Sequence, residues 1–403
     1  MKQKIYLDHS ATTCMDQEVK KAMDTYFEKC FGNPNSFHSF GLEAAEALNK
    51  ARVKVQGLLN ATSEKEIVFT SGGTESVNLA IQGIARGSKK KEIITSKTEH
   101  HAVLHTCEFM ETQGYKITYL DVDVYGRVNP SDLDKAITKD TLLVSIMYAN
   151  NEIGTINDIS KLSSVCKKHK VLFHTDACQA SSQNLDVKKL GVDLLTLNGS
   201  KMYGPKGTGL LYVKNSVNLK PLMFGGSQEF GLRPGTENVP GIIGLAKALE
   251  ITQKNKDKEN KKLIGLRDKM IKFFLEKVPK TVLNGHPVYR LSNNVNISFL
   301  DIEGESILLH LDSQSIAASS GSACTSKSLD PSHVIVATGM PYEIAHGSIR
   351  FTLGRKTTEE EVDKVLEILP GIVESLRKIS PFKLDFDEVT KALPDNLKGK
   401  LKE

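Results

Sequence analysis

Short apolar runs that end in polar residues recur along the first half of the chain, and helix-like segments follow them. The runs have the length of buried strands, and amphipathic stretches such as Ile159–His169 lie between them. The clearest runs are EIVF (66–69), EIIT (92–95), TLLVSIMY (141–148), VLFHTDA (171–177) and DLLTL (193–197). Alternating strands and helices predict an α/β fold in which helices cover both faces of a mainly parallel sheet.

Polar residues follow these runs at the places where the strands of the predicted sheet end. They include Thr74, His100, Asn151, Asp176 and Lys201, which are far apart in the sequence. Ligands of open α/β sheets bind beyond the carboxyl ends of the strands. We therefore expect these side chains to lie close together in a binding site.

The composition excludes several classes of protein. A chain of 403 residues can form more than one domain, and its net charge of +5 is spread without a long basic block, so no direct nucleic-acid partner is expected. Its six cysteines include no C-x-x-C pair, which argues against a zinc site or a disulfide framework and favours a reducing cytoplasm. No apolar run approaches the ~20 residues of a membrane helix, and the start resembles no signal peptide, so no membrane association is expected.

A long helix within residues 246–280 is expected to link two domains. The highly charged stretch 251–262 (ITQKNKDKENKK) is followed by apolar residues at helical spacing. These residues are Leu263, Leu266, Met270, Phe274 and Val278. Beyond the helix, NNVNISFL (293–300) resembles a strand, and Thr358 with Glu361 predicts a capping box at the start of a later helix.

We divide the chain accordingly. Residues 15–255 form the expected large domain, and residues 1–14 and 256–379 form a smaller α+β domain. Residues 380–403 are interpreted as an appended tail.

The turn TSGGTES (70–76) lies between a predicted strand and a predicted helix. Glycines allow backbone N–H groups to approach an anion, and a helix N-terminus attracts it electrostatically. Gly73 and Thr74 are therefore candidate phosphate ligands. A tight turn without a ligand explains the same residues equally well, because neither a Walker lysine nor a dinucleotide fingerprint follows.

The stretch LNGSKMYGPKG (197–207) brings Lys201 to the end of a buried strand. A lone lysine in a loop is usually solvated, which is the simpler interpretation of Lys201. Asp176 lies at another strand end and could simply cap a following helix, with Gln179 on the same face of that helix. His101 and His105 have a spacing that metal ligands use, but no further ligand is near, so no metal is expected. His100 beside them offers a flat ring.

Together, a strand-end lysine, a carboxylate, a phosphate turn and a flat ring suit pyridoxal 5'-phosphate. A lysine amine forms a Schiff base with its aldehyde, and a carboxylate keeps its ring nitrogen protonated, which makes the ring an electron sink. This combination explains a lysine at the end of a buried strand.

The sequence resembles the cysteine desulfurases of the nitrogen-fixation and iron–sulfur-cluster class, within the class V aminotransferases of fold type I. The resemblance runs from IYLDHSATT (5–13) to about residue 378. The other motifs that carry it, in order, are FGNPNSFHSFG, TSGGTES, TEHHAVLHTC, ANNEIGTI, HTDACQA, GSKMYGPKGTG, RPGTENVPGIIG, SSGSACTS and SIRFTLGR. The SSGSACTS form places the chain in the first of the two desulfurase groups.

The resemblance implies roles for single residues around the cofactor. Lys201 would bind it covalently and move the Cα proton of the substrate, Asp176 would pair with the ring nitrogen, and His100 would stack on the ring. Asn151 and Gln179 would contact the ring oxygen.

Other residues would bind the phosphate and the substrate. Gly73, Thr74 and Ser200 would bind the phosphate, with Asn198 beside them, and Arg350 would bind the substrate carboxylate together with Asn151. Thr236 would reach the phosphate in a second subunit, so the resemblance implies a homodimer.

Cys324 lies in AASSGSACTSKSLDPS (317–332), whose small polar residues are typical of a mobile surface loop. Without the resemblance, a small loop residue is the simpler interpretation. With it, the Cys324 thiolate attacks the sulfur of bound L-cysteine, which leaves a persulfide and L-alanine. An iron–sulfur scaffold protein or a tRNA-thiolation protein would then accept the sulfur.

The sequence also departs from the family pattern. Many relatives have Ser/Thr-x-His-Lys where this chain has Asn198, Gly199, Ser200 and Lys201, so the histidine contact to the phosphate is absent. Cys14 stands where proline is common, and Cys178 is interpreted as a small packing residue. The alternatives are a selenocysteine lyase or class V aminotransferase, which would not need Cys324, and a non-catalytic sulfur-relay scaffold, which would need neither Lys201 nor Asp176.

Overall fold

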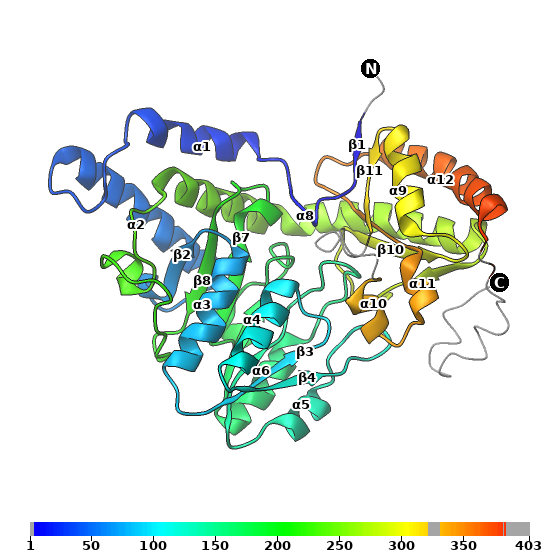
Figure 1. Ribbon diagram of the computed structural model, residues 1–403. Coiled ribbons are helices and arrows are strands. Elements are labelled where there is room, and N and C mark those ends of the chain that lie inside the picture. The colour runs from blue at the N-terminus through cyan, green and yellow to red at the C-terminus, as the bar shows by residue number, and fades with distance from the viewer. Residues whose placement is uncertain (1–3, 321–330, 382, 384–403) are drawn as a thin grey trace.

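The computed structural model describes residues 4–320, 331–381 and 383, and its largest element is a seven-stranded sheet (Figure 1). The strand order is β2 (Ile67–Thr70), β8 (Gly209–Val213), β7 (Leu194–Asn198), β6 (Leu172–Asp176), β5 (Thr141–Ser145), β3 (Glu92–Ser96) and β4 (Lys116–Leu120). The strands from β7 to β4 are parallel, whereas β8 runs antiparallel to both of its neighbours. The predicted α/β class with a mainly parallel sheet is therefore confirmed, and β4 is a strand that the sequence analysis missed.

Neighbouring residues of a strand point to opposite faces of the sheet. Both faces of this sheet carry apolar side chains, and helices cover both of them. Val144 belongs to one apolar cluster and Leu143 to another, so each face has its own core. The helices of this part are α1 (Gln17–Glu28), α2 (Ser39–Leu59), α3 (Gly73–Arg86), α4 (His101–Thr112), α5 (Pro130–Ala136), α6 (Ile159–His169) and α7 (Val187–Leu190). The predicted helix at residues 159–169 is confirmed as α6.

A second, antiparallel sheet carries the later part of the chain. Its strand order is β12 (Ser319–Ser320), β13 (Ser348–Thr352), β10 (Asn294–Phe299) and β9 (Thr281–Leu283). The accompanying helices are α9 (Gly304–Ser313), α10 (His333–Ala337), α11 (Tyr342–His346) and α12 (Glu359–Ile379). The expected capping box is confirmed, since the Thr358 hydroxyl accepts from the Glu361 N–H and the Glu361 carboxylate accepts from the Thr358 N–H.

The N-terminal end of the chain also lies with this second sheet. Strand β1 (Ile5–Tyr6) pairs in parallel with β11 (Ile316–Ala317). Asp8 then forms a bridge to Thr352 of β13. After Asp8, the chain runs from this second sheet toward α1, which belongs to the part of the structure with the seven-stranded sheet (Figure 1).

Helix α8 (Val239–Lys277) runs between the two parts of the structure (Figure 1). Its first turns pack against α1 and α2, and its last turns pack against β9, β10 and α12. The charged run predicted from the sequence lies between these two contacts, and Met270 and Phe274 are buried in the second core. The bridging helix is confirmed, although it begins earlier than residue 246, while the division at residues 255 and 256 stays a prediction.

Two other expectations cannot be compared with the described residues. Cys324 and nearly all of the predicted tail, residues 382 and 384–403, lie outside the described ranges. Within those ranges, no helix has both the length and the apolar character needed to cross a membrane.

Truncation of Phe274 tests the second core. Its ring is fully buried, stacked on Phe351 at 5.9 Å and edge-on to Phe299 at 5.7 Å. We expect Phe274→Ala to lower the free energy of unfolding by about 3–5 kcal/mol, because it leaves a cavity. Phe273→Ala, next to it but only partly buried, should cost about 1 kcal/mol. Urea denaturation followed by far-UV circular dichroism measures both, and equal losses would contradict this account of the core.

Candidate active site

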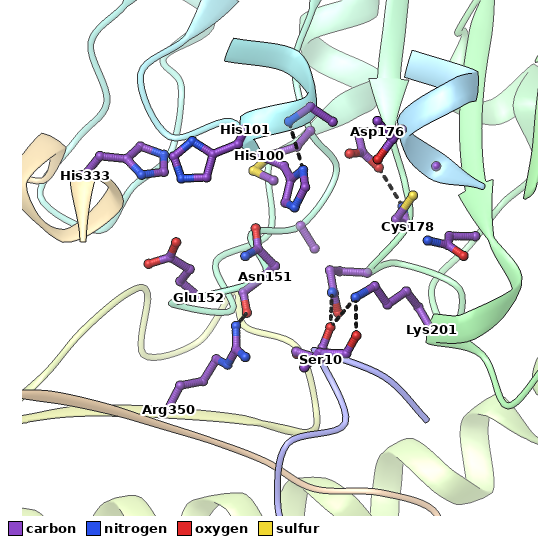
Figure 2. Close-up of a pocket in the computed structure, with 18 residues that line it drawn as sticks. Ser10, His100, His101, Asn151, Glu152, Asp176, Cys178, Lys201, His333 and Arg350 are labelled. Atoms are coloured by element: carbon purple, nitrogen blue, oxygen red, sulfur yellow. Dashed lines mark hydrogen bonds between the residues drawn. The ribbon is translucent and has the colours of Figure 1, made fainter. Parts of the chain in front are cut away.

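A pocket lies at the carboxyl ends of β3, β6 and β7, where the first sheet faces β13 of the second (Figure 2). The five residues expected to converge, Thr74, His100, Asn151, Asp176 and Lys201, all line it. Gly73, Gln179, Asn198 and Arg350 line it as well. The topology of the sheet thus brings together side chains from widely separated motifs, although their individual roles stay predictions.

Lys201 ends a short 3-10 helix (Gly199–Lys201) that follows β7 directly. Its side chain is half-buried, and its Nζ donates to the backbone carbonyls of Ser10 at 2.7 Å and Ala11 at 2.6 Å. The strand end therefore delivers the amine into the pocket, where two backbone acceptors orient it (Figure 2).

Residues 8–16, here called the N-terminal strap, connect β1 with α1 across the lysine turn. The Thr13 N–H and hydroxyl both donate to the Ser200 carbonyl at 2.9 Å, and the Thr13 hydroxyl accepts from the Tyr203 N–H at 2.8 Å. The strap is thus fixed on both sides of Lys201. The sequence analysis missed Ser10 and Ala11 as pocket residues, and their place in the first family motif was the one available indication.

Asp176 is the last residue of β6 and is almost completely buried. It caps no helix, because residues 177–186 form turns and α7 begins only at Val187. Its carboxylate instead accepts from the Cys178 N–H at 2.9 Å. The alternative in which Asp176 caps a following helix, with Gln179 on the same face, is therefore excluded; Gln179 reaches the pocket from a turn, and its Nε2 donates to the Ser10 carbonyl at 3.0 Å.

Cys178 packs closely, as predicted, but it also lines the pocket. A Cβ placed on Gly73 would lie 2.7 Å from the Cys178 sulfur, so the turn before α3 needs a glycine there. Burial raises the pKa of the Cys178 thiol well above its ordinary value, with the Asp176 charge adding to the effect. Cys178 is therefore a neutral thiol at physiological pH.

His100 begins α4 as its N-cap, and its Nδ1 accepts from the Ala102 N–H at 3.1 Å. This bond requires an unprotonated Nδ1 and assigns the remaining ring proton to Nε2. Burial lowers the pKa of His100, and the charge on Lys201 lowers it further, whereas Asp176 opposes the shift. His100 thus presents a neutral, flat ring to the pocket.

The first turn of α3 faces the pocket through Gly73 and Thr74. Gly72 is its N-cap and provides no side-chain hydrogen bond, so backbone N–H groups at this terminus stay available for an anion. Asn198 lies beside them, since its Nδ2 is 3.6 Å from the position of a Gly73 Cβ. The turn is tight, and its role as a phosphate site stays a prediction.

Two expected phosphate ligands are placed differently from the rest. The Ser200 hydroxyl donates to Asn198 Oδ1 at 3.1 Å, and Ser200 is not among the residues that line the pocket. Thr236 is exposed in the loop before α8 and does not line the pocket of its own chain either. The phosphate contacts of both residues stay predictions, as does the role of Cys324.

Arg350 enters the pocket from β13 and is almost completely buried. Its Nη1 donates to the Asn151 carbonyl at 3.0 Å, and its Nη2 donates to Asp8 at 2.8 Å. Its Nε is buried and has no hydrogen-bond partner within the described ranges. One guanidinium donor is therefore unpaired within these ranges, and the role of Arg350 toward a substrate carboxylate stays a prediction.

Further titratable groups surround the pocket, and the sequence analysis did not single out all of them. The His101 ring lies 4.9 Å from His105 and 4.8 Å from His333. In the part of the chain that is described, no group of three or more His, Cys, Asp or Glu side chains could hold a metal ion. Burial raises the pKa of Glu99 to about 8 and that of Glu152 to about 7.

Comparisons with known proteins agree with this arrangement. The model of the class V aminotransferase family matches residues 5–365. The chain is 53% identical over 380 residues to "Cysteine desulfurase IscS" of Methanosarcina thermophila, and these residues cover 94% of each of the two chains. It is 51% identical over 389 residues to "Cysteine desulfurase IscS" of Dictyoglomus turgidum, covering 96% of this chain and 98% of that one.

Solved structures show the same relationship. A "NifS-like protein" superposes with a TM-score of 0.86 at 36% identity and covers 93% of this chain and 100% of its own. "SspA in complex with cysteine" superposes with a TM-score of 0.76 at 33% identity, over 88% of this chain and 100% of that one. The chain therefore belongs to the class V aminotransferase family, and within it to the cysteine desulfurases of the nitrogen-fixation and iron–sulfur-cluster class.

Proposed function

We propose that this protein is a pyridoxal-phosphate-dependent cysteine desulfurase that converts L-cysteine to L-alanine and keeps the sulfur as a persulfide on Cys324. One observation carries the proposal. Lys201, Asp176, a neutral His100 and the uncapped N-terminus of α3 line a single pocket, and Arg350 enters it from the second sheet. The names of the relatives, which are cysteine desulfurases, support L-cysteine as the substrate.

The residues of the pocket fit pyridoxal phosphate. The uncapped turn at Gly73 and Thr74, with Asn198 beside it, suits the phosphate, and the Asp176 carboxylate suits the ring nitrogen. Lys201 supplies the amine for covalent attachment, and Asn151 and Gln179, which line the same pocket, would contact the ring oxygen. When bound, the cofactor supplies an electron sink for the substrate carbanion.

The side chains of the protein divide the remaining work. Arg350 binds the substrate carboxylate, Lys201 moves the proton on Cα, and neutral His100 exchanges a proton at Nε2. The Cys324 thiolate attacks the substrate sulfur, so an S–S bond forms while the C–S bond breaks. The electron pair stays with carbon, which takes up a proton. L-Cysteine and the Cys324 thiol thus become L-alanine and a persulfide.

The working assembly is a homodimer in which Thr236 reaches the phosphate site of the second copy. Its exposure in an isolated chain agrees with that role. The sulfur acceptor is an iron–sulfur scaffold protein or a tRNA-thiolation protein, and the reaction takes place in the cytoplasm. A selenocysteine lyase or aminotransferase would not need Cys324, and a sulfur-relay scaffold would not need the buried pair of Lys201 and Asp176.

Lys201→Ala removes the proposed attachment amine. We expect borohydride reduction of the wild-type holoenzyme to fix one pyridoxyl group on Lys201, which peptide mass spectrometry locates, and no group to be fixed in the variant. Lys206→Ala is the control, because Lys206 is exposed in the next turn. A tag on a different lysine in the variant would contradict the assignment.

Cys324→Ala tests the thiol. The variant should keep the visible absorbance of the bound cofactor, because no cofactor contact is removed, but it should release neither alanine nor sulfide from L-cysteine under reducing conditions. Cys30→Ala, which removes a partly exposed thiol outside the strap, should behave like wild type. Release of alanine and sulfide that persists in Cys324→Ala would remove Cys324 from the mechanism.

Arg350→Lys keeps the positive charge but loses the planar fork. Loss of one charged hydrogen bond, worth about 1.5–3 kcal/mol, should raise KM for L-cysteine about 10- to 100-fold. Cysteamine lacks the carboxylate, so its affinity measured by competition should be nearly equal in both proteins. An equal loss of affinity for cysteamine would show that Arg350 maintains the structure of the pocket rather than binding the substrate carboxylate.

A further inference from the structure

Glu152 belongs to a turn after β5 of the first sheet, and this turn is hydrogen-bonded to β10 of the second sheet beside the pocket. Its N–H donates to Asn150 Oδ1 at 2.8 Å, and its carbonyl accepts from the Nδ2 groups of Asn294 and Asn296 of β10, each at 3.0 Å. Backbone and amide contacts thus fix the turn. The Glu152 side chain is not needed for them, and its carboxyl is buried in the wall of the pocket.

The carboxyl group of Glu152 contacts the start of α10. It accepts a hydrogen bond from the hydroxyl of Ser332, which is itself buried. The same hydroxyl accepts from the Ile335 N–H at 3.2 Å as the N-cap of α10. One hydroxyl therefore joins the helix start to the pocket wall and uses both its donor and its acceptor capacity.

The next residue makes a second contact with the pocket. His333 Nε2 donates to the Glu99 carbonyl at 3.0 Å, and its ring lies 4.8 Å from that of His101. Burial lowers the pKa of His333, so a neutral ring makes this bond. Ser332 and His333 together fix the helix start to the turns that follow β3 and β5.

We propose that Glu152 is a positioning residue for sulfur transfer, because it fixes Ser332, to which the segment that carries Cys324 is covalently joined. This inference rests on the proposed function. Cys324 precedes Ser332 by eight residues in the sequence. Eight residues span at most about 28 Å, so the position of Ser332 limits the places that the thiol can reach.

The surroundings of Glu152 determine whether its carboxyl group carries a charge. Burial favours the neutral acid and raises the pKa of Glu152 to about 7, whereas the hydrogen bond from Ser332 and the charge on Arg350 favour the carboxylate. His101 and His333 line the same pocket, and burial lowers the pKa of each ring. The hydrogen bond from Ser332 forms in either state, because the carboxylate and the carbonyl oxygen of the neutral acid can both accept it.

The test compares Glu152→Ala, Ser332→Ala, the double variant and Glu152→Gln as holoenzymes. We expect single-turnover formation of alanine from L-cysteine to fall about tenfold or more in each alanine variant. The double variant should be no slower than the slower single variant, because both changes break the same bond. Glu152→Gln can still accept from Ser332, so it should stay within threefold of wild type and lose any pH dependence centred near 7.

Binding of L-alanine, which has no sulfur to transfer, separates positioning from substrate binding. Its affinity, followed by visible absorbance, should stay within twofold in all variants. A parallel loss of affinity, additive effects in the double variant, or unchanged single-turnover rates would each overturn the proposal.

Amide hydrogen exchange of residues 333–337 tests the anchor without turnover. Exchange should be faster in Glu152→Ala and Ser332→Ala than in wild type and Glu152→Gln, with or without cofactor. Equal exchange in all four proteins would overturn the proposal by itself. Failure of the wild type to form alanine would reject the proposed function instead, and this comparison would still decide whether Glu152 anchors α10.

Discussion

Two backbone carbonyls, those of Ser10 and Ala11, hold the amine of Lys201 where the two sheets meet. The lysine comes from the end of β7, whereas the carbonyls come from the N-terminal strap, which starts beside the second sheet. A site of this kind exists only when both parts of the structure are folded and docked. The long helix α8, which contributes to both cores, explains how one chain maintains that arrangement.

Desolvation is the second constraint, because it sets which groups around the pocket carry a proton. Burial keeps His100 neutral, and it lowers the pKa of His174, below the pocket, to about 4. The His174 ring contacts the hydroxyls of Ser145 at 2.8 Å and Thr196 at 3.0 Å, so its ring nitrogens are satisfied without a charge. Glu99, with a pKa of about 8, keeps its proton at neutral pH. The histidines and Glu99 near Lys201 and Asp176 are therefore neutral, whereas Arg350 enters the same pocket with its charge.

The sequence predicted the part of the fold that depends on apolar patterns and the part of the site that depends on strand ends. It missed β4, because Lys116–Leu120 are only partly buried and lack a continuous apolar run. The antiparallel direction of β8 was not predicted either, since strand direction depends on the connection rather than on the residues. The helix expected after Asp176 is absent because the chain turns there, although Gln179 still reaches the pocket.

Other parts of the site could not have been found from residue types. Ser10 and Ala11 act through backbone carbonyls, which every residue has. Glu152 and His333 contribute through contacts between segments that are distant in the sequence. Such pairings depend on the docking of the two sheets, and local patterns carry no information about it.

A crystal structure of the protein with pyridoxal phosphate is the most direct test of the central claim. The account predicts electron density continuous from Lys201 Nζ to the ring, the phosphate at the first turn of α3, and the ring nitrogen next to Asp176. Cofactor density elsewhere, with the amine still bound to the two strap carbonyls, would contradict it.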